Sequence, residues 1–213
     1  MITAADISRL RASTGAGMLD CKAALEEANG DQDKAGEILR KKGVVKAAKR
    51  ADKVAGEGTV ASYIHGGGRI GVLVEVNCET DFVARTDGFK DLVKEIGLHI
   101  SAANPRYLDR SEVPAEVVAK EKEIYAEQLK GKPAEMMENI LKGKIEKFYE
   151  EICLVDQFYI KDDSKKIHQL LAEKTGETGE KITIRRFARF ELGEGIEKHA
   201  KNFADEVAEQ VGK

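Results

Sequence analysis

A β-hairpin pattern lies near the middle of the chain, in Gly58-Thr59-Val60-Ala61-Ser62-Tyr63-Ile64-His65-Gly66-Gly67-Gly68-Arg69-Ile70-Gly71-Val72-Leu73-Val74-Glu75-Val76-Asn77-Cys78-Glu79. Two runs rich in β-branched and aromatic residues flank a cluster of glycines. This pattern predicts two antiparallel strands, because glycine adopts the backbone angles that a tight hairpin turn needs. The glycines also match GxGxxG, but a dinucleotide site requires a helix after them, and here a second strand follows.

Helices and strands then follow one another without strict βαβ alternation, which predicts an α+β core with an antiparallel sheet. Residues 86–103 have helical spacing, and two prolines begin a predicted helical hairpin over 114–151. The remaining expected elements are an extended segment at Leu154–Ile160, a helix from Ser164 to about Glu173, a strand at 181–192 and a helix at about 196–211.

The predicted strand at 181–192 alternates in polarity, which indicates two distinct faces. One face is expected to carry Ile182, Ile184, Arg186, Ala188 and Phe190, and the other Thr183, Arg185, Phe187, Arg189 and Glu191.

Upstream of the hairpin, residues 1–43 predict a small domain of three short helices. Thr3 and Asp6 form a capping-box pattern, Asn29-Gly30 is a helix stop, and Asp31 or Asp33 can cap a third helix that ends at Gly43. About 40 residues bury little core, so this domain is expected to serve as a docking module. Residues 44–57 predict a linker with partial helix, and residues 58–213 the core domain.

Composition restricts the class of protein. The 213 residues are 42% hydrophobic and 34% charged, with a net charge of −3 and no Trp. This predicts a globular cytoplasmic protein without a nucleic-acid surface, because a strong basic field and stacking aromatics are missing. No apolar run approaches the roughly 20 residues of a membrane span.

Chemistry-bearing residues are scattered. There is no GxxxxGK[ST] phosphate loop, and the three cysteines and four histidines show no metal-ligand spacing, so neither a cofactor nor a metal is expected. Cys78, His99 and Asp81 could be combined into a hydrolase triad, but nothing in the sequence brings them together. The chain is therefore not expected to be an enzyme.

The polar end of the hairpin, Asn77-Cys78-Glu79-Thr80-Asp81-Phe82-Val83-Ala84-Arg85, allows two interpretations. In the first, Thr80 or Asp81 caps the next helix and Phe82 anchors it in the core. In the second, an Asp81-Phe82 tip projects and wedges into a partner.

Three long motifs resemble the elongation factor Ts family. They are Leu10-Arg11-Ala12-Ser13-Thr14-Gly15-Ala16-Gly17-Met18-Leu19-Asp20-Cys21-Lys22-Ala23-Ala24-Leu25, then Glu75-Val76-Asn77-Cys78-Glu79-Thr80-Asp81-Phe82-Val83-Ala84, and Arg189-Phe190-Glu191-Leu192-Gly193-Glu194-Gly195-Ile196-Glu197-Lys198. Their order is that of the family, and the match covers nearly the whole chain.

The resemblance implies a ubiquitin-associated-like N-terminal domain and a role as guanine nucleotide exchange factor for elongation factor Tu. It implies docking through Arg11, Thr14, Gly15, Met18 and Leu19, and insertion of Thr80, Asp81, Phe82 and Val83 near the partner's magnesium and phosphate site. The region around His99 is similar to a further contact. A single hairpin-and-helix module resembles the short bacterial type, which implies a homodimer through the core, with the strand at 181–192 as its contact.

Two other classes of protein remain open. A ubiquitin-associated-like adaptor that only tethers proteins accounts for residues 1–42 but leaves the rest without a role. An RNA-binding factor acting through the basic residues of 44–57 would show strongly salt-dependent affinity.

Overall fold

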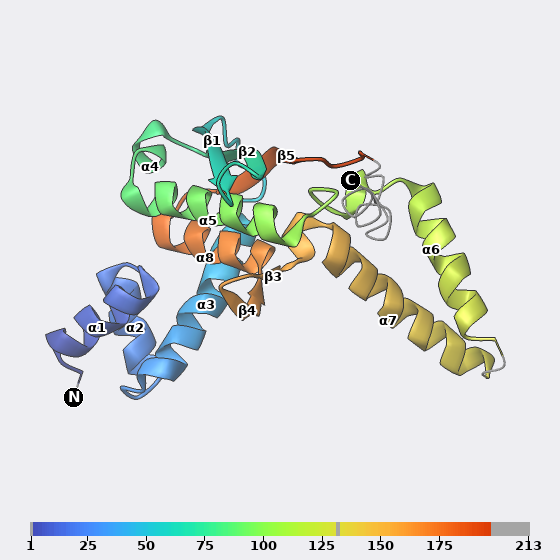
Figure 1. Cartoon of the computed structure of the whole chain (residues 1–213). Coiled ribbons are helices and arrows are strands. Elements are labelled where there is room, and N and C mark those ends of the chain that lie inside the picture. Colours follow the sequence, from blue (N-terminus) through green and yellow to red (C-terminus); the bar gives the residue numbers. More distant parts are fainter. Residues whose placement is uncertain (1, 131–132, 197–213) are drawn as a thin grey trace, which may run out of the picture.

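The computed structural model describes residues 2–130 and 133–196, and within them it has the predicted α+β fold. A three-helix module precedes an α+β core along the chain, and a projecting helical hairpin is inserted within the sequence of that core (Figure 1). The predicted helix at 196–211 and the Gly131-Lys132 turn lie outside the described residues, apart from Ile196.

The N-terminal module consists of α1 (Ala4–Thr14), α2 (Met18–Glu27) and α3 (Gln32–Lys49). The capping box is confirmed: Asp6 N–H donates to Thr3 Oγ1 at 3.2 Å, and Thr3 N–H donates to Asp6 Oδ2 at 3.0 Å. Asp31 caps α3, as one of the two alternatives predicted. The helices close over a small core of Leu10, Ala16, Cys21, Ala24, Leu25, Ala28 and Ala35.

The predicted end of the third helix at Gly43 is wrong, because α3 continues to Lys49. Gly43 is buried where α3 crosses α8 (Ile167–Thr178), and a Cβ placed on Gly176 would lie 2.7 Å from the Gly43 Cα. The missing side chain of Gly176 therefore permits the close approach of the two helices, and a Cβ on Gly43 itself would meet its nearest atom, Ala172 O, at an ordinary 3.5 Å.

The sheet joins β1 (Glu57–His65), β2 (Ile70–Cys78) and β5 (Thr183–Glu191), in the order β1-β2-β5 and antiparallel throughout. The hairpin prediction is confirmed, and the three glycines at 66–68 all have positive φ. A second strand follows them, which excludes the dinucleotide interpretation.

The predicted faces of the last strand are wrong beyond Ile184. A bulge opposite Glu75 and Val76 leaves Arg185 without a direct partner, since Glu75 pairs with Arg186 and Val76 with Ile184. An extra residue reverses the alternation that follows it. As a result Phe187 packs against the core, whereas Phe190 is exposed.

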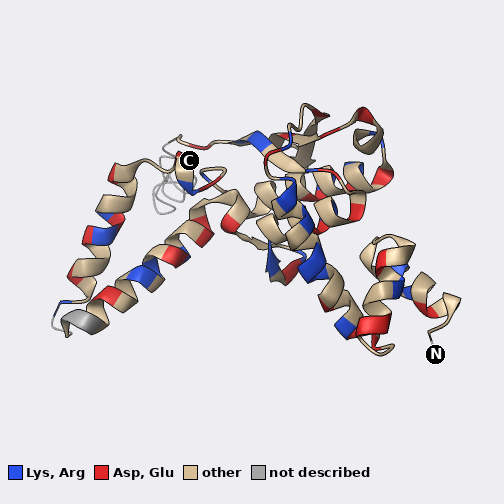
Figure 2. Ribbon diagram, turned by 180° about the vertical axis from the view of Figure 1, so that it is seen from behind, with Lys and Arg blue, Asp and Glu red and all other residues tan. Residues whose placement is uncertain are grey.

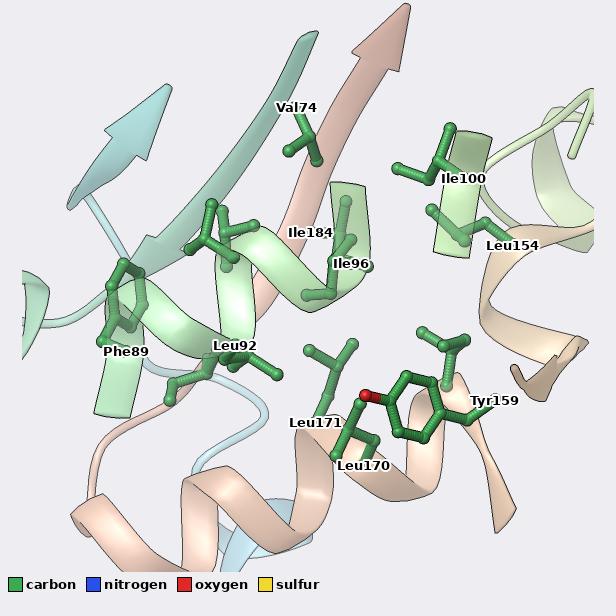
Figure 3. Close-up of a cluster of buried hydrophobic side chains, with 14 of the residues drawn as sticks. Val74, Phe89, Leu92, Ile96, Ile100, Leu154, Tyr159, Leu170, Leu171 and Ile184 are labelled. Carbon is green, nitrogen blue, oxygen red and sulfur yellow. The ribbon is translucent and has the colours of Figure 1, made fainter. Parts of the chain in front are cut away.

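Helix α5 (Asp87–Ala103) lies between the sheet and α8, and its apolar side chains build the main core (Figure 3). Those labelled are Phe89, Leu92, Ile96 and Ile100, which meet Val74 and Ile184 of the sheet and Leu170 and Leu171 of α8.

Helices α6 (Ala115–Gln128) and α7 (Ala134–Ile152) form the predicted hairpin, which projects away from the core (Figure 2). The 3-10 turn η1 (Arg110–Glu112) braces its base, because Arg110 donates to Asp156 at 2.9 Å and to Glu146 at 3.1 Å.

The segment between α7 and α8 differs from prediction. A 3-10 turn η2 (Leu154–Asp156) and a small sheet of β3 (Phe158–Tyr159) and β4 (Asp162–Lys166) occupy it. Ser164 lies in β4, where its hydroxyl donates to Asp162 at 2.6 Å, so it does not cap a helix. Helix α8 begins at Ile167 instead. At its N-terminus the Gln169 side chain accepts a hydrogen bond from the Lys166 N–H at 2.8 Å.

Candidate protein-binding site

The end of β2 leads into a one-turn helix, α4 (Asp81–Ala84), which carries the predicted tip. Thr80 is its N-cap, with Oγ1 3.5 Å from the Val83 amide nitrogen. Val83 and Ala84 pack against the main core, whereas the Phe82 side chain is 78% exposed. In a single turn these neighbours can face the core only if Phe82 points to solvent.

The two interpretations of this segment are thus each half right. Thr80 is a helix cap, as the first requires, but Phe82 is not a core anchor and projects as the second requires. Asp81 forms an exposed ion pair with Arg85 at 2.8 Å, which leaves its carboxylate accessible beside Phe82.

The base of the tip is held by residues that the sequence analysis did not single out as functional. Thr80 donates to Glu180 through both its N–H, at 3.0 Å, and its hydroxyl, at 2.7 Å. Glu79 accepts from Arg50 at 2.8 Å and from the Lys181 N–H at 2.6 Å. The Lys181 amide and then Arg50 hold the pKa of Glu79 below its ordinary value. No local signal could identify Glu180, which lies 100 residues from Thr80.

The predicted docking residues gather around the turn between α1 and α2. Leu19 is 84% exposed and Met18 about half exposed, while Arg11 and Gly15 are also exposed. The turn is ordered locally, since Thr14 Oγ1 donates to Leu10 O at 2.6 Å and Gly15 has φ +69°.

The α1–α2 turn and α4 lie at the same end of the molecule, opposite the α6–α7 hairpin (Figure 1). The structure therefore brings the predicted docking residues and the predicted tip to one side of the protein. Large exposed apolar side chains in such a grouping are typical of protein–protein contact surfaces.

His99 is not part of this surface. Its side chain is 1% exposed, and Nε2 lies 3.0 Å from Gln157 Oε1 while Nδ1 accepts the Ile160 N–H at 3.3 Å. Burial lowers the pKa of this imidazole, and both ring nitrogens have internal partners. The predicted contact through the His99 side chain is therefore not available in this conformation.

The hydrolase triad is also not formed. Cys78 is fully buried and its thiol donates to Thr80 O at 3.1 Å, while burial and then the charge of Glu180 raise its pKa. A protonated thiol is a poor nucleophile. His99 and Asp81, the other two members, are paired with Gln157 and Arg85 instead.

A cleft of about 560 Å³ separates the N-terminal module from the core. Acidic and basic side chains line it together, and several are paired: Arg40 with Glu173 at 3.0 Å, Lys165 with Glu173 at 2.8 Å and Lys46 with Asp20 at 2.8 Å. Paired charges leave little net field for an ionic ligand, so the cleft is better described as a polar junction.

Within the described ranges, no group of three or more His, Cys, Asp or Glu side chains could hold a metal ion. In the same part of the chain, every helix is too short or too polar to cross a membrane. A braced aromatic tip and an exposed apolar turn at one end of the molecule are features of a protein that binds another protein.

Comparisons with known proteins agree with this class. A family model described as "Elongation factor TS" matches residues 22–194. Proteins called Elongation factor Ts from Anaeromyxobacter sp. (strain K), Syntrophomonas wolfei subsp. wolfei (strain DSM 2245B / Goettingen) and Geobacter sulfurreducens (strain ATCC 51573 / DSM 12127 / PCA) are 59%, 57% and 55% identical to the chain. Each match covers 99% of this chain and, in the same order, 97%, 100% and 99% of the relative. The chain belongs to the elongation factor Ts family.

Proposed function

We propose that the chain is a guanine nucleotide exchange factor for elongation factor Tu and acts in translation elongation in the cytoplasm. The observation that carries this proposal is Phe82, a large aromatic side chain held in solvent at the end of a family signature. An exposed aromatic side chain at the same end of the molecule as other exposed apolar side chains is typical of a protein-binding surface.

In this proposal the protein binds its partner in two places. Arg11, Thr14, Gly15, Met18 and Leu19 dock on the GTPase domain of factor Tu. The tip of Thr80, Asp81, Phe82 and Val83 inserts near the magnesium and phosphate site and displaces elements that hold them. Their common position at one end of the molecule supports simultaneous contact (Figure 1).

No covalent chemistry is needed for this function. A GTPase holds GDP through backbone donors and magnesium, and release is slow while these supports stay in place. A factor that binds the nucleotide-free form better than the GDP form must weaken GDP binding by the same ratio. An inserted aromatic ring can shift packed elements as units, because packed cores are bistable and do not deform continuously.

The test is stopped-flow release of a fluorescent GDP analogue from purified bacterial elongation factor Tu. We expect this chain to accelerate release by on the order of a hundredfold at saturation, near the upper end of typical coupling between two ligands. Unchanged release, with a folded chain and a competent partner, would contradict the proposal. Binding without acceleration would favour the tethering adaptor instead.

The RNA-binding alternative is less well supported by the geometry. The basic residues expected to form its surface are partly neutralised, since Lys46 pairs with Asp20 and Arg50 with Glu79, both at 2.8 Å. Lysines and arginines of the protein are interspersed with acidic residues (Figure 2).

We also propose a homodimer through the outer face of the sheet. Val60, Ile64, Leu73 and Phe190 are all about half exposed or more and lie on that face, where Gly71 pairs with both Ile64 and Phe190. A group of exposed apolar side chains on one sheet face favours a self-complementary contact with a second copy. Because of the bulge, β5 contributes Ala188 and Phe190 to this face, but not Ile184.

Sedimentation equilibrium tests the dimer. We expect a mass near twice that of the chain at micromolar concentration, and a monomer for Leu73→Glu, because a carboxylate in an apolar contact is strongly unfavourable. A monomeric wild-type chain at such concentrations would contradict this contact.

A further inference from the structure

The tip is too short to orient itself. A helix of one turn has no cooperative stability of its own, so the direction of Phe82 depends on the groups that anchor α4. Val83 and Ala84 provide apolar anchors toward the main core. The polar anchors lie on the preceding residues, Glu79 and Thr80, and come from two segments far away in the sequence.

The first polar anchor is Glu180. Its two carboxylate oxygens accept separately from the Thr80 hydroxyl, at 2.7 Å, and the Thr80 N–H, at 3.0 Å. Hydrogen bonds to a charged acceptor are stronger than neutral ones, and two of them fix a direction as well as a distance. Glu180 follows Gly179, the left-handed C-cap of α8, so it extends from a helix that is itself packed in the core.

The second polar anchor is Arg50. It is the C-cap residue of α3, and its NH1 donates to both carboxylate oxygens of Glu79 at 2.8 Å. Glu79 also accepts the Lys181 N–H, and the Lys181 ammonium donates to Ala51 O at 2.6 Å and Lys53 O at 3.1 Å. The end of α3, the end of α8 and the start of the tip are thus joined in one network.

This network connects the two proposed contact regions. Helix α3 is the third helix of the docking module, and α4 is the tip. If their relative orientation is fixed before binding, docking delivers Phe82 to its target without a further search. Preorganisation of this kind lowers the entropic cost of the productive complex.

We propose that Glu180, through Thr80, and Arg50, through Glu79, are positioning residues for the exchange reaction. They hold the Asp81-Phe82 tip in a fixed direction relative to the docking module, and neither needs to touch factor Tu. This inference rests on the proposed function and adds residues that act on the insertion step.

The test separates docking from insertion. GDP-analogue release is measured over a range of concentrations for wild type, Glu180→Gln and Arg50→Gln. We expect each variant to lower the maximal rate by about tenfold and to change the half-saturating concentration by less than about twofold, because a loosened tip still docks. Asp163→Asn, at an exposed acidic position on β4, is the charge-matched control for Glu180→Gln and should behave as wild type.

A second readout needs no partner. Hydrogen–deuterium exchange of the free proteins should show faster exchange at residues 80–85 in Glu180→Gln, with α5 and the rest of the sheet unchanged. A maximal rate equal to wild type in both variants would overturn the proposal. Unchanged hydrogen exchange at residues 80–85 would also overturn it. So would a rise in the half-saturating concentration as large as the fall in the maximal rate.

The two proposals fail in different ways. If the wild-type chain does not accelerate GDP release, the proposed function fails, and the hydrogen-exchange measurement still decides whether Glu180 holds the tip. If wild type is active and Glu180→Gln is indistinguishable from it in both readouts, only the positioning role fails.

Discussion

Replacement of Phe82 by alanine is expected to slow GDP release from elongation factor Tu by roughly thirtyfold, as for loss of an aromatic interface residue worth about 2 kcal/mol. The ring is 78% exposed and outside the described core clusters, so the free energy of unfolding should change by less than about 0.5 kcal/mol. Stopped-flow kinetics and urea unfolding measure the two quantities. The effect on function should therefore appear without an effect on the fold.

The kinetic form of the loss distinguishes a wedge from an ordinary contact. A side chain that inserts after docking should affect the maximal rate more than the half-saturating concentration. Phe158→Ala is a suitable control, because this ring is exposed on β3 away from the tip and should not change either parameter. Equal losses of rate and affinity in Phe82→Ala would argue against the wedge.

The direction of the Phe82 side chain also shows which features of the site could be predicted from the sequence alone. The Thr80 cap and the capping box at Thr3 and Asp6 were predictable because each depends on residues within three positions of one another. Whether Phe82 pointed inward or outward depended on which neighbours packed against α5 and the sheet, and this is a tertiary property. The sequence left both directions open.

Features that depend on distant partners were missed for the same reason. The bulge at Arg185 arises where β5 meets Glu75 and Val76, so strand periodicity alone gave the wrong faces. Likewise the Glu180–Thr80 contact joins segments that show no common pattern. The family motifs include the surface residues of the site and also Glu79 and Thr80, but not Glu180 or Lys181, which hold that segment in place.

The predicted helix end at Gly43 is the most informative error. The reason for it points to a second substitution with a large expected effect, at Gly176. Glycine is common after helix ends, but Gly43 lies within α3, at the crossing with α8 where Gly176 has no room for a side chain. At the crossing of α3 and α8, a Cβ on Gly176 would lie 2.7 Å from the Gly43 Cα. The Gly43 Cα is a backbone atom and the added Cβ is fixed to the backbone of residue 176. Neither atom can move aside unless the two helices separate.

Gly176→Ala should therefore destabilise the protein by about 1–3 kcal/mol, the usual cost of overpacking a close contact. It should also raise the concentration of factor Tu needed for half-maximal exchange, because α3 carries the docking module and ends at Arg50 beside the tip. Urea unfolding and stopped-flow titration measure these two effects.

Two alanine variants in α3 are matched controls for Gly176→Ala. A Cβ at Gly43 itself meets its nearest atom, Ala172 O, at an ordinary 3.5 Å, and one at Gly36 meets nothing within 4 Å. Gly36→Ala should stabilise the helix by roughly 0.5–1 kcal/mol, and Gly43→Ala should be tolerated, since alanine is a better helix former. If Gly176→Ala were as stable as these two, the crossing could not be the fixed joint between docking module and core. The tip and the docking turn would then have to find their sites on factor Tu independently, and the polar network at Glu79 and Thr80 could orient only the tip.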